Sequence, residues 1–221
     1  MKKSWWLLFA LHGLWAGSAE AVSVKVRHEL QDGGPSRIHA EGVLNATPEA
    51  VWDYLIRFND YSKFMPRVRE SFFISLEGVE RLRGSIKQGS EAARKIAENY
   101  RTEMPRKIGK KWEGMVFMAL DLPFPVKNRW YIIRAIQDET QGSRRLYQRC
   151  WSFVTGNIAG ASGCWNLSPT DQPTETLARY EDNINPGGHV PHWIAELGAD
   201  QTVPQIFDSL ERVAQVGVKK R

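Results

Sequence analysis

The sequence has few of the features on which catalysis, cofactor binding or metal binding usually depends. It contains neither a phosphate-binding loop nor a dinucleotide-binding fingerprint, and the segment 160–163 lacks the glycine spacing of a nucleophile elbow. His189 and His192 are spaced as His-x-x-His, but no acidic or cysteine partner is obvious, and a catalytic zinc ion usually has three protein ligands. Glu181 and Asp182 are neighbours on one expected strand and point to opposite faces, so they cannot act as an acid–base pair. We therefore expect no metal and no cofactor, and the sequence alone identifies no catalytic residue.

Long apolar runs are also scarce. A membrane-spanning helix needs about 20 predominantly apolar residues, and no segment after residue 21 provides them. The formal net charge is +5, and part of it lies in the tail 219–221. No nucleic-acid-binding motif accompanies this charge, so we expect no nucleic-acid partner. A solvated surface is the first interpretation of the charge, and contact with an anionic membrane is the second.

The first residues are typical of an export signal. Lys2 and Lys3 precede an apolar run at 5–15, and Ala19-Glu20-Ala21 forms an A-x-A cleavage site. An uncleaved membrane anchor is the alternative, but the apolar run is shorter than a membrane span requires. We expect residues 1–21 to be a signal peptide, so that the mature protein is secreted or periplasmic and begins at Val22.

Residues 22–221 have the length of one domain, and their pattern is rich in strands. Residues 22–30 alternate between apolar and polar side chains, and the Asp-Gly-Gly-Pro turn at 32–35 leads into a second strand at 37–46. Few segments are long enough to form parallel crossovers, so the sheet should be mainly antiparallel. Further strands are expected at 69–77, 79–83, 111–120, 129–138, 144–154, 160–167 and 176–184.

Helices are expected on both sides of this strand-rich region. Thr47 and Pro48 suit the start of a helix, because threonine caps free backbone N–H groups and proline fits the first helical position. A second short helical turn follows this helix. Near the C-terminus, residues 203–214 have an apolar face at helical spacing, and we expect this helix to lie across a concave sheet. Pro204 should either kink it or separate it from a shorter helix that begins at Pro191.

Four segments resemble one known superfamily in their order along the chain. They are the strand–helix–helix–strand pattern at 45–71, LPFPVKNRW at 122–130, GCWNLSP at 163–169 and NPGGHVPHW at 185–193. Together they resemble the START-like (SRPBCC) superfamily, which includes polyketide cyclase/dehydrase, coenzyme Q-binding and lipid-transport proteins. The resemblance implies an α+β helix-grip fold. In such a fold a curved antiparallel sheet wraps around a long C-terminal helix and encloses a hydrophobic cavity.

Residues 85–104 depart from this resemblance. The superfamily would have strand here, but the segment has the pattern of a helix, with Ser90 as its cap and an apolar face that includes Ala93. We interpret it as a helical insertion that packs against the sheet. The alternative is a lid or a membrane-docking element, because basic residues lie at 94–95 and 106–111 and each can favour anionic lipid by about 1 kcal/mol.

The two cysteines lie on consecutive expected strands. An odd-length loop centred on Asn157 would place Cys150 and Cys164 directly opposite each other, whereas a two-residue turn would put them on opposite faces. An oxidising compartment favours the first arrangement. We predict a Cys150–Cys164 disulfide, with two buried thiols as the alternative.

The function implied by the resemblance is the binding or carriage of a hydrophobic small molecule or lipid. Aromatic residues on inward faces and a few polar groups are the candidates for ligand contact, although such residues are also typical of an ordinary core. These candidates are Trp112, Phe117, Arg129, Tyr131, Trp151 or Phe153, Tyr180, Trp193, Phe207 and Leu210. Two other functions stay open: a cyclase/dehydrase-type enzyme acting on a polyketide-like substrate, and a structural or interaction protein with a filled core.

Overall fold

The structure is a computed structural model that describes residues 22–29, 37–87, 89–122, 127–185, 187 and 192–218, with the backbone alone at 192–199 and at Val218. Several predictions fall outside these residues. They are the signal peptide at 1–21, the turn at 32–35, part of the motif at 122–130, His189 and the tail at 219–221. Among the described helices, none combines the length and the apolar composition that a transmembrane span requires.

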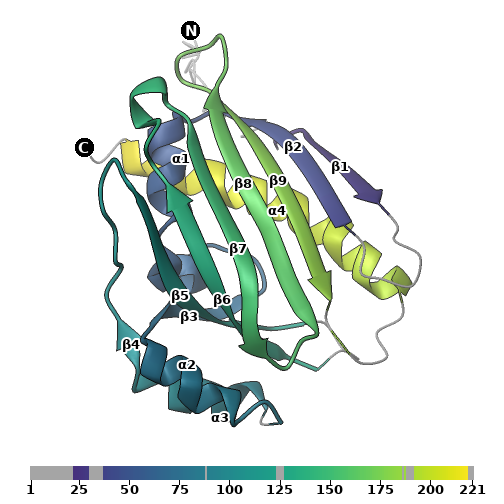
Figure 1. The fold of residues 1–221 in the computed structure, drawn as a ribbon. Helices are drawn as coiled ribbons and strands as arrows, with labels where there is room; N and C mark the ends of the chain where they lie inside the picture. Colours follow the sequence, from purple (N-terminus) through teal and green to yellow (C-terminus); the bar gives the residue numbers. More distant parts are fainter. Residues whose placement is uncertain are drawn as a thin grey trace, which may run out of the picture.

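The described strands form one antiparallel sheet of nine strands in the order β1-β2-β9-β8-β7-β6-β5-β3-β4 (Figure 1). The strands are β1 (Val24–Glu29), β2 (Arg37–Leu44), β3 (Val68–Ile74), β4 (Arg101–Thr102), β5 (Lys111–Leu120), β6 (Arg129–Asp138), β7 (Tyr147–Gly156), β8 (Gly160–Pro169) and β9 (Thr176–Asn185). The first two form the predicted hairpin, with Val24 opposite Gly42. Antiparallel pairing follows from the short connections between consecutive strands.

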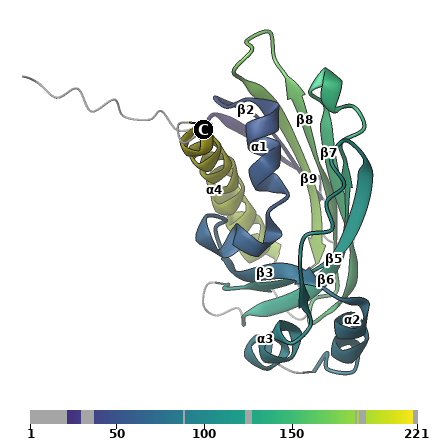
Figure 2. The same ribbon diagram turned by 90° about the vertical axis from the view of Figure 1, so that its left-hand side faces the viewer.

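Helix α1 (Pro48–Leu55) begins as the sequence predicted. The Thr47 hydroxyl accepts a hydrogen bond from the backbone N–H of Ala50 at 3.3 Å, and Pro48 takes the first turn. The short 3-10 helix η1 (Phe58–Lys63) follows, and a second one, η2 (Gly142–Arg144), joins β6 to β7. Helix α1 lies beside the C-terminal helix on the inner side of the curved sheet (Figure 2).

Helix α2 (Leu76–Arg83) corrects the prediction of a strand at 79–83. The Ser75 hydroxyl accepts a hydrogen bond from the N–H of Gly78 at 3.2 Å and so caps a helix at this point. Val79 and Leu82, three residues apart, are buried on one side of that helix. Three-residue spacing places two side chains on one face of a helix but on opposite faces of a strand, so the helix, and not the strand, buries both.

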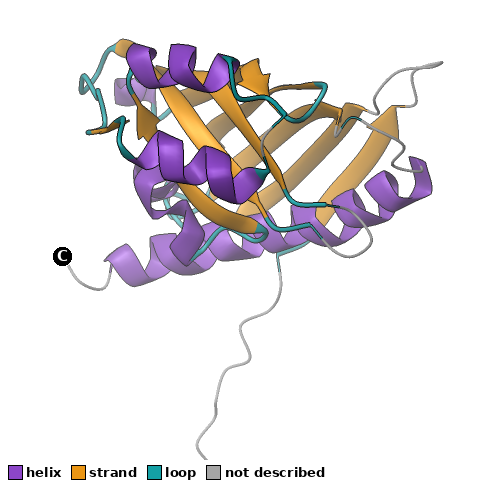
Figure 3. Ribbon diagram, turned by 90° about the horizontal axis from the view of Figure 1, so that it is seen from below, coloured by secondary structure: helices purple, strands orange, loops and turns teal. Residues whose placement is uncertain are grey.

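Helix α3 (Ser90–Glu98) confirms the helical insertion but not its cap, because Gly89 is the N-cap and Ser90 is the first helical residue. Ala93 and Ala97 are fully buried. Helices α2 and α3 lie on the outer, convex side of the sheet, whereas α1 and the C-terminal helix lie on the inner side (Figures 2 and 3). This helix therefore adds packing to the outer face and does not cover the concave face.

Helix α4 (His192–Val218) crosses the concave face as one continuous helix, with Pro204 inside it (Figure 1). Pro204 therefore does not divide it from a separate shorter helix. Phe207, Leu210 and Ala214 have no exposed surface, and their spacing places them on the face that meets the sheet. The helix-grip arrangement follows from this contact.

The sheet is apolar on both faces at its β3–β5–β6 side. Along β5, Trp112 and Val116 belong to the large inner core, whereas Phe117 belongs to an outer core that α2 and α3 cover. Successive side chains of a strand point to opposite faces, so this division follows directly from the strand. Helices α2 and α3 together exclude water from the outer face.

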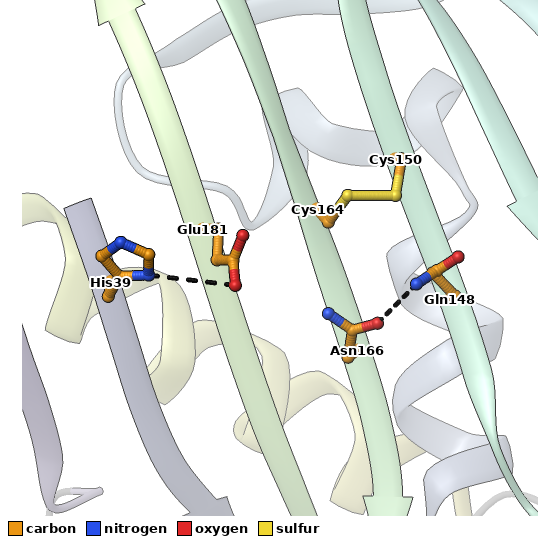
Figure 4. Close-up of a disulfide and its surroundings, with 6 residues drawn as sticks. All are labelled: His39, Gln148, Cys150, Cys164, Asn166 and Glu181. Carbon is orange, nitrogen blue, oxygen red and sulfur yellow. Dashed lines mark hydrogen bonds and ion pairs between the residues drawn. A yellow bond between two sulfur atoms is a disulfide. The ribbon is translucent and has the colours of Figure 1, made fainter. Parts of the chain in front are cut away.

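The predicted disulfide is present. The last β7–β8 pair is Ser152–Ser162, so the connection between paired residues, 153–161, has nine residues and is centred on Asn157, and Cys150 lies directly opposite Cys164. Their sulfur atoms are bonded, and the bond lies on the convex face beside the polar residues Gln148, Asn166 and Glu181 (Figure 4). The odd loop length set this register, as the sequence indicated.

Candidate functional site

The candidate site lies on the concave face, where β6, β7, β8 and β9 adjoin. Trp151 of β7 is paired with Gly163 of β8, and Gly163 is paired with Asp182 of β9. A β-carbon on Gly163 would lie 2.4 Å from the Trp151 ring, so only glycine lets the indole lie across β8. The ring then stacks on Tyr180, with 5.9 Å between ring centroids. This glycine therefore positions the aromatic wall of the site, which consists of Trp151 and Tyr180.

Asp182 is the carboxyl at the centre of this wall. It follows Tyr180 by two residues on β9, so both side chains share the concave face. Burial raises the pKa of Asp182 to about 7, although hydrogen bonds from Tyr180 and the Asn183 backbone act in the opposite direction. A carboxyl that titrates near neutral pH can donate or accept a hydrogen bond, which is typical of functional sites.

Two tyrosines share the surroundings of this carboxyl. Burial, with the negative charge of Asp182, raises the pKa of Tyr131 and of Tyr180 above the ordinary value. Both hydroxyls are therefore protonated near neutral pH and can act as donors. The sequence predicted Tyr131 and Tyr180 as site residues, and the structure places both beside Asp182.

Arg149 is a buried cation on the same face. Its guanidinium donates hydrogen bonds to the backbone oxygen of Leu55, at 2.6 Å, and to the Tyr61 hydroxyl. It also lies 4.8 Å from the ring centroid of Phe58 and 5.5 Å from that of Trp151. Arg149 thus ties the junction of α1 and η1 to the sheet and supports the wall that Trp151 forms.

Part of the concave face is filled by α4. Phe207 and Leu210 are fully buried, and the Phe207 ring lies 5.0 Å from that of Trp165. Phe207 and Leu210 are therefore packed core in this structure. The neighbouring apolar side chains Trp151, Phe153 and Ile184 remain partly exposed, so the accessible part of the concave face lies around Asp182.

The other predicted site residues lie apart from this wall. Phe117 lies on the convex face, packed on Phe72 beneath the insertion, because an odd spacing from Trp112 puts it on the opposite side of β5. Trp112 faces inward at the far end of β5, where its indole N–H donates to Glu139 at 3.1 Å. Arg129 begins β6 and donates to the Lys127 backbone oxygen at 2.9 Å.

Trp193 lies in the first turns of α4, where the structure describes the backbone alone, so its side-chain contribution stays a prediction. Arg149 and Asp182 were not among the residues predicted to bind a ligand, whereas an inward aromatic side chain was expected at Trp151 or Phe153. The signal for Asp182 was the two-residue step from Tyr180, which places a carboxyl on an otherwise apolar face. Among the described residues no three histidine, cysteine or acidic side chains gather as a metal site would require.

Two open hollows lie elsewhere on the sheet, the second of them bordered by Tyr180. One, of about 400 Å³, is lined mainly by polar residues at the η2 end of the sheet, among them Asp138, Gln148 and Asn166. The other, of about 210 Å³, lies over β1, β2 and β9 and is lined by charged side chains such as Arg27 and Glu41. Charged side chains line both hollows, which is not typical of a site for a hydrophobic ligand.

Comparisons with known proteins identify the fold. No family model and no curated protein matches the chain. A STAR-related lipid transfer protein fragment from Xanthomonas axonopodis matches with a TM-score of 0.61 and 20% identity, over 90% of this chain and 97% of that one. Human StAR-related lipid transfer protein 5 matches with a TM-score of 0.57 and 11% identity, over 90% of this chain and 85% of that one.

A third match is the Zhui aromatase/cyclase from a Streptomyces species, with a TM-score of 0.54 and 12% identity, over 82% of this chain and 94% of that one. At these identities the likeness establishes the fold. The chain therefore has the α+β helix-grip fold of START-like proteins, as its sequence predicted.

Proposed function

We propose that this protein binds a hydrophobic small molecule or lipid on the concave face of its sheet, with the polar group of the ligand beside Asp182. The observation that carries the proposal is the group of partly exposed apolar side chains, Trp151, Phe153 and Ile184, around the Asp182 carboxyl, whose pKa is about 7. Exposed apolar surface next to a few converging polar groups is typical of small-molecule sites. The lipid-transfer proteins that share the fold support the same function.

The polar groups favour a particular kind of ligand. At neutral pH, Tyr131 and Tyr180 are protonated donors, and Asp182 alternates between donor and acceptor. A hydroxyl or carbonyl group would find partners here, whereas a carboxylate would meet a partly ionised carboxyl. Because Phe207 and Leu210 fill the middle of the concave face, the apolar part of the ligand should lie toward Ile184.

Native mass spectrometry of protein purified from its host, followed by lipid extraction, tests this proposal. Displacement of a fluorescent lipid then locates the site. Ile184→Trp should fill the proposed space and weaken lipid binding by about tenfold or more, whereas Leu177→Trp, on the opposite face of the same strand, should not. If no molecule copurifies and no lipid binds to the wild type, the concave face is a filled core and the proposal is wrong.

A cyclase/dehydrase-type enzyme is the second candidate, and Asp182 is the observation that favours it. A carboxyl with a pKa near the working pH is suited to general acid–base catalysis, and one protein with this fold is an aromatase/cyclase. Asp182→Asn separates the two functions. A polyketide-like substrate that the wild type converts should still bind this variant but should not be converted by it.

We further propose that the protein works outside the cytoplasm. The predicted signal peptide and the Cys150–Cys164 disulfide both support this location, since disulfides persist mainly in oxidising compartments. Cell fractionation with N-terminal sequencing tests it, and the expected mature N-terminus is Val22. A cytoplasmic protein with an intact N-terminus would contradict the proposal.

A further inference from the structure

The turn that precedes β5 presents an apolar tip. Its backbone closes with a hydrogen bond from the N–H of Lys110 to the oxygen of Lys107 at 3.1 Å, and Gly109 has a φ of 69°. A positive φ at the third position of a turn is typical of type II and favours glycine. Ile108 occupies the second position and is 80% exposed. The turn thus holds a large apolar side chain in solvent.

This exposure is supported by buried contacts beneath the turn. The N–H of Gly109 donates to the Glu139 carboxylate at 3.2 Å, and Arg106 bonds both Glu139, at 3.0 Å, and Asp53, at 3.2 Å. Glu139 is only 4% exposed. Although burial alone would raise the pKa of Glu139, hydrogen bonds from Arg106 and Trp112 lower it, so the carboxylate stays charged. The turn is therefore anchored to the body of the protein.

Cations surround the apolar tip. Lys107, Lys110 and Lys111 are exposed, and none of them forms an ion pair with another described residue. Lys111 is paired with Asp138 on the neighbouring strand β6, so Lys107 and Lys110 carry most of the uncompensated positive charge. The basic residues of the insertion differ, because Arg94 is paired with Glu70 at 3.2 Å and with Glu91 at 3.0 Å.

We propose that the turn 107–111 docks this protein on an anionic lipid bilayer, with Ile108 in the headgroup region and the lysines against lipid phosphates. A bilayer offers apolar depth and negative charge together, which matches an apolar tip within a ring of cations. The turn, and not α3, is then the membrane contact. The register places Lys111 in the same row as Arg179 of β9, five residues before Ile184, so the turn lies toward the opposite end of the sheet from Ile184. Docking is therefore independent of ligand binding on the concave face.

Cosedimentation with vesicles of phosphatidylcholine and phosphatidylglycerol tests the proposal. Each lysine near an anionic surface should strengthen binding by about fivefold, so Lys107→Gln with Lys110→Gln should weaken it by about 25-fold. Lys87→Gln with Lys95→Gln removes the same charge from the insertion and should leave binding nearly unchanged. Ile108→Ser should also weaken binding severalfold, unlike Ile86→Ser, which removes another exposed isoleucine.

A direct probe of insertion accompanies the binding measurement. The two cysteines of the chain are bonded to each other, so Ile108→Cys introduces one reactive thiol for an environment-sensitive dye. The dye should brighten on phosphatidylglycerol vesicles, and at position 86 it should not. The proposal is wrong if the wild type does not bind the vesicles or if the Lys87/Lys95 control loses as much binding as the Lys107/Lys110 variant. It is also wrong if the dye at position 108 does not brighten. Lipid displacement from the concave face should be the same in all turn variants.

Discussion

At the scale of single residues, the site depends on one carboxyl and one glycine. Asp182 sits on an apolar wall, and Gly163 leaves the room that lets the Trp151 ring form that wall. An aspartate or a glycine does not by itself indicate a binding site. Their positions matter because the register places Trp151, Gly163 and Asp182 in one row across three strands.

The raised pKa of Asp182 makes stability depend on pH. The unfolded state loses this proton near pH 4, whereas the folded state keeps it up to about pH 7. The folded state is therefore penalised progressively as pH rises from about 4 to about 7, and the penalty is constant above that range. Asp182→Asn should exceed the wild type in unfolding free energy by at least about 1 kcal/mol at pH 8, with little difference at pH 4.

Chemical denaturation at both pH values measures this difference. Glu181→Gln serves as the control, because that carboxylate is exposed on the opposite face of β9. An equal gap between Asp182→Asn and the wild type at pH 4 and pH 8 would show that Asp182 has an ordinary pKa.

A methyl group at position 163 should disturb the aromatic wall. The added carbon would lie 2.1 Å from the Glu181 backbone oxygen and 2.4 Å from the Trp151 ring, so the indole must move. Gly163→Ala should cost roughly 1–3 kcal/mol and change the near-UV circular dichroism. Gly160→Ala, where nothing lies within 4 Å, is the matched control. Similar effects of both substitutions would mean that backbone flexibility, and not the ring, is responsible.

At the scale of elements, the cross-strand disulfide holds β7 and β8 in register. Its two cysteines are 14 residues apart, and a loop of about that length predicts roughly 3 kcal/mol of stabilisation from the smaller freedom of the unfolded chain. Replacing both cysteines by serine should lower the unfolding free energy by about 2–3 kcal/mol. Reductant should lower the stability of the wild type similarly and leave the serine variant unchanged. If reductant does not change the unfolding free energy of the wild type, the disulfide does not stabilise the protein.

The elements also show where sequence patterns are sufficient. The helix at Thr47 and the hairpin of β1 and β2 were predictable, because caps and alternation act within a few residues. Helix α2 was not, because five residues with two apolar side chains, Val79 and Leu82, are too few to define an element until a partner surface is present. That surface is the outer face of β3, β5 and β6, which is distant in sequence.

At the scale of the whole molecule, polar contacts between described residues join the N-terminal strand to α4. The backbone nitrogen of Val22 donates to Asp208 at 2.8 Å, and His28 Nε2 lies 2.6 Å from Asp200. If cleavage follows Ala21, the nitrogen of Val22 becomes an ammonium group that faces the Asp208 carboxylate. Processing would then turn a hydrogen bond into an ion pair between the first strand and the last helix.

Thermal unfolding can detect this ion pair. Asp208→Asn should destabilise protein that begins at Val22 by about 1 kcal/mol more than protein with a few residues added before Val22, because only the former carries the ammonium group. Asp200→Asn should affect both forms equally. The same loss in both forms upon Asp208→Asn would show that the charge of the N-terminus has no role.

Most strand positions, the first and last helices and the cysteine pair were predictable from the residues, because periodicity, caps and loop length are local properties, and the family resemblance implied the fold class. Tyr131 and Tyr180 stay predicted site residues, whereas Phe117, an odd number of residues from Trp112, lies on the opposite face of β5 from the one expected. Tertiary structure alone decided which apolar residues are core and which stay open, since Phe207 is buried only once Trp165 and α4 meet. It also decided the state of Asp182, whose pKa depends on burial by side chains from other strands.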